Sequence, residues 1–247
     1  MRARAAATVE ADGTGGSRLT ILRSAAPLLL RPTAGALYLV GGAGGPLGGD
    51  DVELDITVGA GASLVVRSAA ASVTQPDGKG RPSRLTVRAR VAAGGSLAWF
   101  PEPSVVASGC HQVLRTDLEL EEGCRLVWRE EVILGRHAEA AGDWDSHMTA
   151  DLAGRPFVRH GLRLGPGVRG WDGPAVAGPA KALGSVLVVG PGRPSEPRVE
   201  DGHAILPLSR AGTMITAVAA DALELRRRLD RALSAVTACQ EAVSRRG

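Results

Sequence analysis

The segment Val52-Glu-Leu-Asp-Ile-Thr-Val58 alternates apolar and polar side chains, and a turn centred on Gly61 follows it. Successive side chains of a β-strand point to opposite faces, so this alternation predicts a strand with one buried face. The same alternation recurs in Leu85-Thr-Val-Arg-Ala-Arg-Val91 and in Val113-Leu-Arg-Thr-Asp-Leu-Glu-Leu120. Each of these segments ends in the same apolar-x-x-Gly-x-x-apolar turn. The sequence therefore repeats one strand-turn-strand unit.

The period of this repeat predicts the architecture. The turn glycines Gly61, Gly94 and Gly123 lie 33 and 29 residues apart, and a weaker copy around Gly154 follows 31 residues later. A period of this length is typical of stacked β units that form an elongated body. We therefore predict an all-β fold, a β-helix or solenoid-like stack of strand-turn-strand units. Its body covers about residues 1–219 of a single domain that spans residues 1–247.

The C-terminal segment changes from the strand period to the helix period. Asp221 is suited to cap a helix, with Glu224 three residues later. One apolar face follows at helical spacing, and its members are Ala222, Leu225, Leu229, Ala232, Leu233 and Val236. We predict a C-terminal helix over about residues 221–243. Arg226-Arg-Arg228 is interpreted as part of its solvated face rather than as a phosphate site.

Composition excludes several classes of protein. The chain has 247 residues, of which 44% are hydrophobic and 22% charged, as in ordinary globular proteins. A net charge of +3 without a basic stripe, and an aromatic content of 3%, argue against nucleic acid as a partner. The most apolar run, Ala34–Gly48, is too short and too rich in glycine to span a membrane. The first residues lack the apolar core of a signal peptide, so we expect a cytoplasmic protein.

The three cysteines, Cys110, Cys124 and Cys239, are an odd number and form no C-x-x-C pair. This pattern argues against a disulfide framework and is compatible with a reducing compartment. Cys110 and His111 are adjacent on a predicted strand and face opposite ways, so they are poorly placed to share a metal ion. We interpret these thiols as buried structural residues rather than as metal ligands.

Gly41-Gly-Ala-Gly-Gly-Pro-Leu-Gly-Gly49 has the glycine density of a phosphate-binding loop. A Walker loop needs Lys and then Ser or Thr after its last glycine, whereas this chain has Asp50 and Asp51, which would repel phosphate. We therefore interpret the cluster as a structural turn that positions Asp50. Its structural glycines are Gly44, Gly45, Gly48 and Gly49.

Two acidic groups stand out within the predicted strands. Asp51, Glu53 and Asp55 share one face of their strand and form a ladder of carboxylates. One interpretation is a solvated outer face. The other is a polar internal passage that attracts divalent cations, since carboxylates are hard oxygen donors that hold such ions loosely. The pair Glu130-Glu131 interrupts an apolar strand, and either a salt bridge with Arg136 or a wet channel would compensate its burial.

Three segments carry a resemblance to a known family. They are Leu37-Tyr-Leu-Val-Gly-Gly-Ala-Gly-Gly-Pro-Leu-Gly-Gly-Asp50, Leu97-Ala-Trp-Phe-Pro-Glu-Pro103 and Leu134-Gly-Arg136. They resemble signature segments of the UreD/UreH family of urease accessory proteins, in the order of that family and at about its spacings. Weaker similarity runs from the first residues to about Leu233.

This resemblance implies a β-helix-like scaffold chaperone without enzymatic activity, which acts in nickel insertion and metallocentre assembly for nitrogen metabolism. The partners it implies are apo-urease, UreF and, through UreF, the nickel-carrying GTPase UreG. No tightly bound cofactor is implied, but Ni²⁺ would pass transiently through an internal tunnel. The family's tunnel positions fall on Asp50, Asp51, Ser72, Glu130 and Arg136, with Asp50 and Glu130 as transient nickel ligands. The ladder residues Glu53 and Asp55 complete the predicted nickel path.

The chain departs from the family pattern at two places. Gly142-Asp-Trp144 stands where the family usually has Gly-Glu-x-Phe, and Ala217 stands where arginine is frequent. These departures weaken the transfer of residue roles near both positions.

Two other functions fit the repeat. One is a β-solenoid carbohydrate-binding or carbohydrate-active protein, although one Tyr and two Phe are few for an aromatic-lined groove. The other is a purely structural solenoid without a metal passage. The chain has neither a G-x-S-x-G nor an H-E-x-x-H motif, and we assign no catalytic residue.

Overall fold

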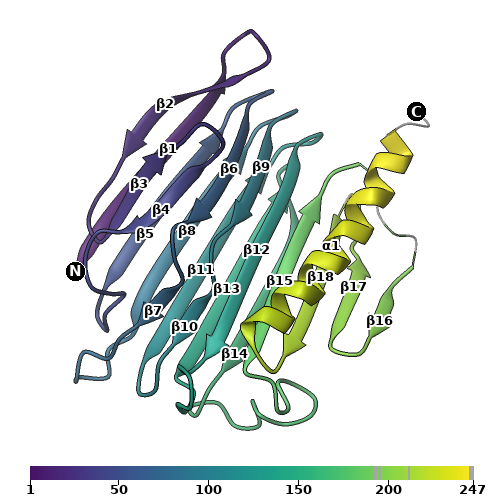
Figure 1. Cartoon of the computed structure of the whole chain (residues 1–247). Helices are drawn as coiled ribbons and strands as arrows, with labels where there is room; N and C mark the ends of the chain where they lie inside the picture. The colour runs from purple at the N-terminus through teal and green to yellow at the C-terminus, as the bar shows by residue number, and fades with distance from the viewer. Residues whose placement is uncertain (192–193, 195, 211, 245–247) are drawn as a thin grey trace.

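The computed structural model describes residues 1–191, 194, 196–210 and 212–244, without the side chains of residues 239–244, among them Cys239. Within this part of the chain, the strands form two sheets that pack face to face (Figure 1). The all-β, solenoid-like fold with a C-terminal helix is confirmed. One sheet has seven described strands, in the order β14 (Arg155–Leu164), β13 (Asp143–Leu152), β11 (His111–Leu120), β8 (Ser83–Val91), β5 (Asp51–Val58), β1 (Arg2–Ala11) and β2 (Ser17–Arg23).

The other sheet has eleven described strands. Nine of them lie in the order β16 (Arg198–Glu200), β17 (His203–Pro207), β18 (Gly212–Ala219), β15 (Ala182–Val189), β12 (Arg125–Leu134), β9 (Ser96–Phe100), β6 (Ser63–Ser68), β4 (Leu37–Gly41) and β3 (Leu28–Pro32). Two short strands, β7 (Ser72–Thr74) and β10 (Ser104–Val106), pair with one another, and β10 also pairs with β12.

The predicted turns are the corners at which the chain crosses from one sheet to the other. β5, β8 and β11 in the seven-stranded sheet lead into β6, β9 and β12 in the eleven-stranded sheet. Equivalent strands of successive units then pair in parallel and in register. Backbone hydrogen bonds also link the corners, because the N–H of Ser96 donates to Ala62 O and that of Arg125 donates to Gly95 O. Stacked corners thus fix the register of the strands on both sides.

The fourth copy of the repeat folds differently from the first three. β13 and β14 form an antiparallel hairpin within the seven-stranded sheet, so the chain does not cross at this turn. Its two turn residues, Ala153 and Gly154, have φ values of 51° and 69°. Two successive positive φ angles are typical of a tight type I′ turn, which reverses a strand within its own sheet. The weaker match of this copy therefore reflects a different turn.

The main core lies between the two sheets. In strands such as β5, β8 and β11, every second residue points inward and is buried, as Leu54, Val87 and Leu118 illustrate. The indole rings of Trp99 and Trp128, on neighbouring strands, stack at 4.5 Å between ring centroids. The predicted period-two burial is therefore present in both sheets.

A second, smaller core joins the predicted helix, α1 (Ala222–Ser244), to the outer face of the eleven-stranded sheet. Asp221 caps α1 as predicted, because its carboxylate accepts a hydrogen bond from the N–H of Glu224 at 2.9 Å. The helix lies over β15, β17 and β18, and no described helix or strand covers β4, β6 and β9 on this face (Figure 1). Among the described residues, no helix is long and apolar enough to cross a membrane.

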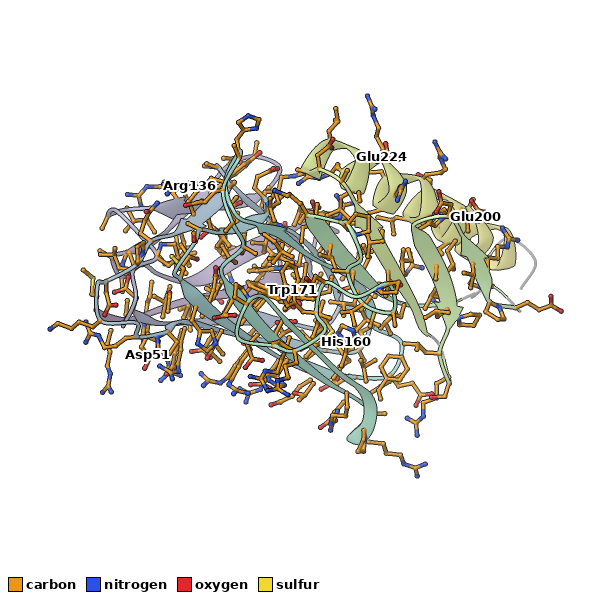
Figure 2. All side chains as sticks on the ribbon, turned by 90° about the horizontal axis from the view of Figure 1, so that it is seen from below. Asp51, Arg136, His160, Trp171, Glu200 and Glu224 are labelled. Atoms are coloured by element: carbon orange, nitrogen blue, oxygen red, sulfur yellow. The ribbon has the colours of Figure 1, made fainter. Side chains whose placement is uncertain are left out.

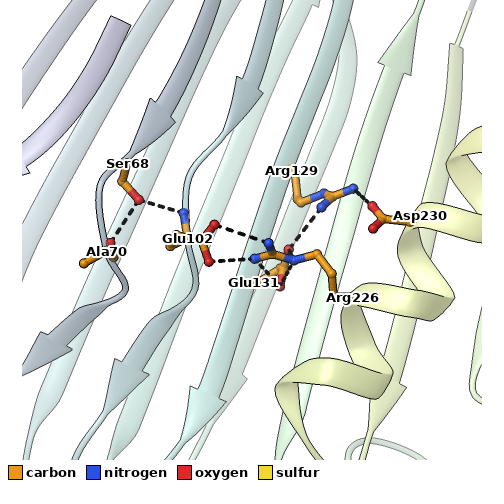
Figure 3. Close-up of polar contacts among 7 residues, drawn as sticks. All are labelled: Ser68, Ala70, Glu102, Arg129, Glu131, Arg226 and Asp230. Atoms are coloured by element: carbon orange, nitrogen blue, oxygen red, sulfur yellow. Dashed lines mark hydrogen bonds and ion pairs between the residues drawn. The ribbon is translucent and has the colours of Figure 1, made fainter. Parts of the chain in front are cut away.

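A network of charged side chains fastens the edge of α1 to the sheet. Arg226 reaches from the helix to Glu131 at 3.1 Å and to Glu102 at 3.2 Å (Figure 3). Arg129 of β12 contacts Glu131 at 3.5 Å and pairs with Asp230 of the helix. Arg226 therefore belongs to a part-buried ion network and not to the solvated face of the helix that was predicted for it. Arg227 is exposed, as that prediction requires.

We predict that α1 depends on its buried leucine for docking. Leu229→Ala removes a fully buried side chain from the second core and should lower the free energy of unfolding by about 2–5 kcal/mol. The matched control is Leu223→Ala on the same helix, where the side chain is 61% exposed and the change should stay within about 0.5 kcal/mol. Urea unfolding of both variants measures the difference. Equal effects would contradict this account of helix packing.

Candidate functional site

Glu130 is an acidic residue on the interior face of the molecule. In β12, the inward positions are Trp128, Glu130 and Val132, and both hydrophobic neighbours belong to the core between the sheets. Glu131 is the next residue and therefore points to the opposite face, towards α1. The two adjacent acids thus lie in different environments.

The Glu130 carboxylate is bonded through only one of its oxygens. Oε1 accepts hydrogen bonds from Thr116 Oγ1 at 2.6 Å and from Trp128 Nε1 at 3.0 Å. Among the described residues, no donor lies within hydrogen-bonding distance of Oε2. Burial raises the pKa of the Glu130 carboxyl above its ordinary value, and the bonds from Thr116 and Trp128 oppose this rise. The site therefore holds an acid with one oxygen available.

Two cavities meet at this acid. One has a volume of about 400 Å³, extends towards the glycine-rich turn, and is lined by Pro46, Ser72 and Trp99 among others. The second has a volume of about 240 Å³ and lies on the side of β14, β15 and β18. Glu130, Glu131 and Trp144 line both cavities. The two cavities thus adjoin at Glu130 in the interior of the molecule.

Polar residues continue from Glu130 along the wall of the smaller cavity. Ser185 of β15 pairs in register with Glu130, and Thr216 of β18 pairs with Ser185, so the three form one polar row. His160 of β14 and Ser146 of β13 line the same cavity from the other sheet. The His160 Nδ1 atom is buried and has no hydrogen-bond partner among the described residues. Figure 2 shows His160 near the middle of the molecule.

This arrangement suits brief contact with a divalent cation. Carboxylate and hydroxyl oxygens are hard ligands, and imidazole nitrogen is a good ligand for nickel. The described residues include no group of three or more His, Cys, Asp or Glu side chains placed to hold a metal together. A cation in the two cavities would thus meet one carboxylate and one imidazole, a donor set that favours release over storage.

The predicted turn residues lie at the glycine-rich end of the larger cavity. Asp50 is buried, and its carboxylate accepts hydrogen bonds from the N–H of Leu47 at 2.9 Å and from the Met1 amino group at 2.7 Å. Gly49 has a φ of +84°, and a Cβ on Gly48 would lie 2.7 Å from Arg81 O. These contacts fit the predicted structural turn around Asp50. Of these turn residues, Gly45 lines the larger cavity and Gly48, Gly49 and Asp50 do not, whereas Gly44 has open space around it.

The acidic ladder lies on the outer face of the seven-stranded sheet. Its carboxylates pair with arginines of the flanking strands, Glu53 with Arg88 at 2.6 Å and Asp55 with Arg4 at 2.7 Å. Asp51 lies 3.7 Å from Arg2 and is at the edge of the molecule in Figure 2. The structure thus agrees with the solvated outer face, and the interior location considered for these three carboxylates is wrong. The inward positions of this strand hold Val52, Leu54 and Ile56.

Of the two kinds of compensation considered for the Glu130-Glu131 pair, the salt bridge with Arg136 is not formed. Arg136 lies in an exposed loop and pairs with Glu139 through two hydrogen bonds of 2.9 and 2.8 Å. It lowers the pKa of Glu139 to about 2. Glu131 is compensated by Arg129 and Arg226 instead. Arg136 is therefore engaged within its own loop.

Cys110 and Cys124 are buried free thiols. Burial raises the pKa of both, that of Cys124 to about 11. The Cys110 thiol donates to Thr74 O at 3.2 Å. Both are therefore protonated structural residues at neutral pH, as predicted. The prediction for Cys239 lies outside the described side chains.

Sequence reasoning missed the residues that surround Glu130. His160, Ser185 and Thr216 come from strands without a clear motif, and only the sheet topology brings them together. One signal was present in the sequence: Thr116 occupies an inward position between Leu114 and Leu118 of β11. A polar residue at such a position indicates a buried polar partner.

Comparison with known proteins identifies the family. The family model described as UreD urease accessory protein matches residues 1–246. A relative from Parafrankia sp. (strain EAN1pec), named Urease accessory protein UreD, is 46% identical over 258 residues, which cover 93% of this chain and 87% of the relative. A relative of the same name from Streptomyces avermitilis is 43% identical over 246 residues, which cover 96% of this chain and 98% of the relative. The chain therefore belongs to the UreD family of urease accessory proteins.

Proposed function

We propose that this chain acts in urease maturation as a cytoplasmic scaffold chaperone without catalytic activity. It binds apo-urease and UreF, and through UreF it works with UreG. Nickel, the cargo, passes through the interior of the scaffold towards the urease active site. Family membership supports the maturation role.

The observation that carries the nickel path is the position of Glu130 at the junction of the two cavities. An ionised carboxylate there would attract a hydrated divalent cation into a space that is otherwise largely apolar. The single available oxygen, with the unpartnered Nδ1 atom of His160 in the same cavity, would bind nickel weakly enough to pass it on. Ser72 would line the entry side of this path.

The role is tested by co-expressing the chain with apo-urease, UreF and UreG. Size-exclusion chromatography measures assembly, and a urease assay with and without the chain measures activation. The proposal expects co-elution and activation that depends on the chain. A chain that neither co-elutes nor changes activation would refute the maturation role.

We predict that Glu130→Gln lowers urease activation several-fold while the accessory complex still assembles. Glutamine keeps an oxygen that accepts from Thr116 and Trp128, so the fold is retained, but the charge that attracts the cation is lost. The matched control is Glu53→Gln, the same change on the outer face. Activation should fall for Glu130→Gln and stay unchanged for Glu53→Gln. Full activation by Glu130→Gln would exclude a path past this residue.

The same variant should change the pH dependence of stability. Because the pKa of Glu130 is raised in the folded chain, the folded state binds its proton more tightly than the unfolded state does. The protonated Glu130 carboxyl therefore stabilises the folded state fully at pH values below the ordinary pKa of about 4.3. This stabilisation is lost as the pH rises through the pKa that Glu130 has in the folded chain. Glu130→Gln should therefore be more stable than the wild type at pH 7, and the advantage should vanish in acid. Urea unfolding across pH checks this, and a pH-independent difference would contradict it.

A further inference from the structure

One half of the outer face of the eleven-stranded sheet has no covering element among the described residues (Figure 1). The outward positions follow from the buried ones: Leu64, Val66, Leu97 and Trp99 belong to the core, so their neighbours in β6 and β9 face outward. These outward residues include Val65, Ala98 and Phe100, all half-buried. Tyr38 and Val40 continue the apolar surface on β4. We call this surface the open face.

A row of alternating arginine and aromatic side chains crosses the open face. Arg31 pairs in register with Tyr38, Tyr38 with Arg67, and Arg67 with Phe100. The Arg67 guanidinium lies 5.8 Å from the centroid of the Phe100 ring, and that of Arg129 lies 5.1 Å from it on the other side. The row thus runs over five strands, from β3 to β12, and ends beside α1.

The arginines of this row differ in their partners. Arg129, at the end beside α1, is neutralised by Asp230 of the helix and by Glu131. Among the residues that the structure describes, neither Arg31 nor Arg67 forms an ion pair, and both are exposed. The open face is therefore apolar with two arginines that lack a carboxylate. At the end of the row that α1 covers, Asp230 of the helix supplies a carboxylate to Arg129.

The spacing of the row matches the packing distance of helices. Arg129 and Arg67 are two strands apart, which corresponds to about 9.6 Å at about 4.8 Å per strand. Packed helices lie about 8–10 Å apart. A helix beside α1 would therefore place its acidic residue over Arg67, as α1 places Asp230 over Arg129.

A groove at the boundary of the open face supports the same geometry. A cavity of about 270 Å³ lies where the C-terminal half of α1 meets β9 and β12. Its lining includes Ala98, Val127, Thr237 and the exposed Arg125. The apolar residues of this groove would contact the apolar face of a docked helix, and the basic residue at its edge would contact the acidic side of that helix.

We propose that the open face docks an amphipathic helix of a partner protein that lies alongside α1 and carries acidic residues over Arg67 and Arg31. This goes beyond the proposed nickel path, because it concerns the outer surface and needs neither cavity. The apolar side of the partner helix would cover Val65, Ala98 and Phe100.

Photo-crosslinking tests the surface in the full chain. Val65→benzoylphenylalanine places the probe on the open face, and Thr86→benzoylphenylalanine is the matched control, half-buried on the outer face of the other sheet. Each variant is co-expressed with urease, UreF and UreG, and the cross-linked segment is sequenced by mass spectrometry. The proposal expects Val65 alone to capture an acidic amphipathic helix of another protein. A second copy of this chain, a basic segment, or a yield no higher than that of Thr86 would overturn it.

Charge reversal then tests the role of the row. Arg67→Glu should lower the cross-link yield about tenfold, whereas Arg115→Glu, an exposed arginine on the other sheet, should leave it unchanged. Reversing the facing acid of the captured helix to Arg should restore the yield with Arg67→Glu. An undiminished yield with Arg67→Glu would overturn the proposal. Glu130→Gln should leave the cross-link intact, which separates failure of this inference from failure of the nickel path.

Discussion

The fold depends on the in-register parallel pairing of successive units, which the stacked corners enforce. Because side chains alternate along a strand, fixed register means that each position keeps its face from one unit to the next. An inward residue of one unit therefore stacks on an inward residue of the next, as Leu54, Val87 and Thr116 do. A polar residue in such a row must find its partner inside the molecule. Thr116 finds it in Glu130 across the two sheets.

The same constraint explains the charges on the outer face of the seven-stranded sheet. Parallel stacking would place like charges side by side if every unit had the same charge pattern, and like charges on adjacent strands are destabilising. The chain alternates instead: β1 presents arginines, β5 presents the acidic ladder, and β8 presents arginines again. The ladder is thus neutralised within its own sheet. The acid that lines the two interior cavities, Glu130, comes instead from the interrupted apolar pattern of β12.

The sequence predicts those parts of the structure that depend on local patterns. Alternation locates the strands, the recurring glycines locate the corners, and Asp221 with its apolar face locates α1. Glu130 could be singled out because an acid in an apolar strand is unusual. The residues around Glu130 could not be predicted, because only the order of the strands in the sheets brings His160, Ser185 and Thr216 close to it. Alternation marks the apolar side of the ladder strand as the side that faces the core, but it does not tell whether the carboxylates on the other side face water or a polar interior space. Family membership favours urease maturation over the carbohydrate-binding alternative.

The central claim is that nickel passes between the sheets beside Glu130, and anomalous diffraction at the nickel absorption edge tests it most directly. Crystals of the chain would be soaked in Ni²⁺ and the anomalous peaks located. The account predicts a peak in the cavity that Glu130 and His160 line, and the disappearance of that peak in Glu130→Gln. Peaks confined to the outer surface, at the acidic ladder or at the exposed His137, would contradict an interior path.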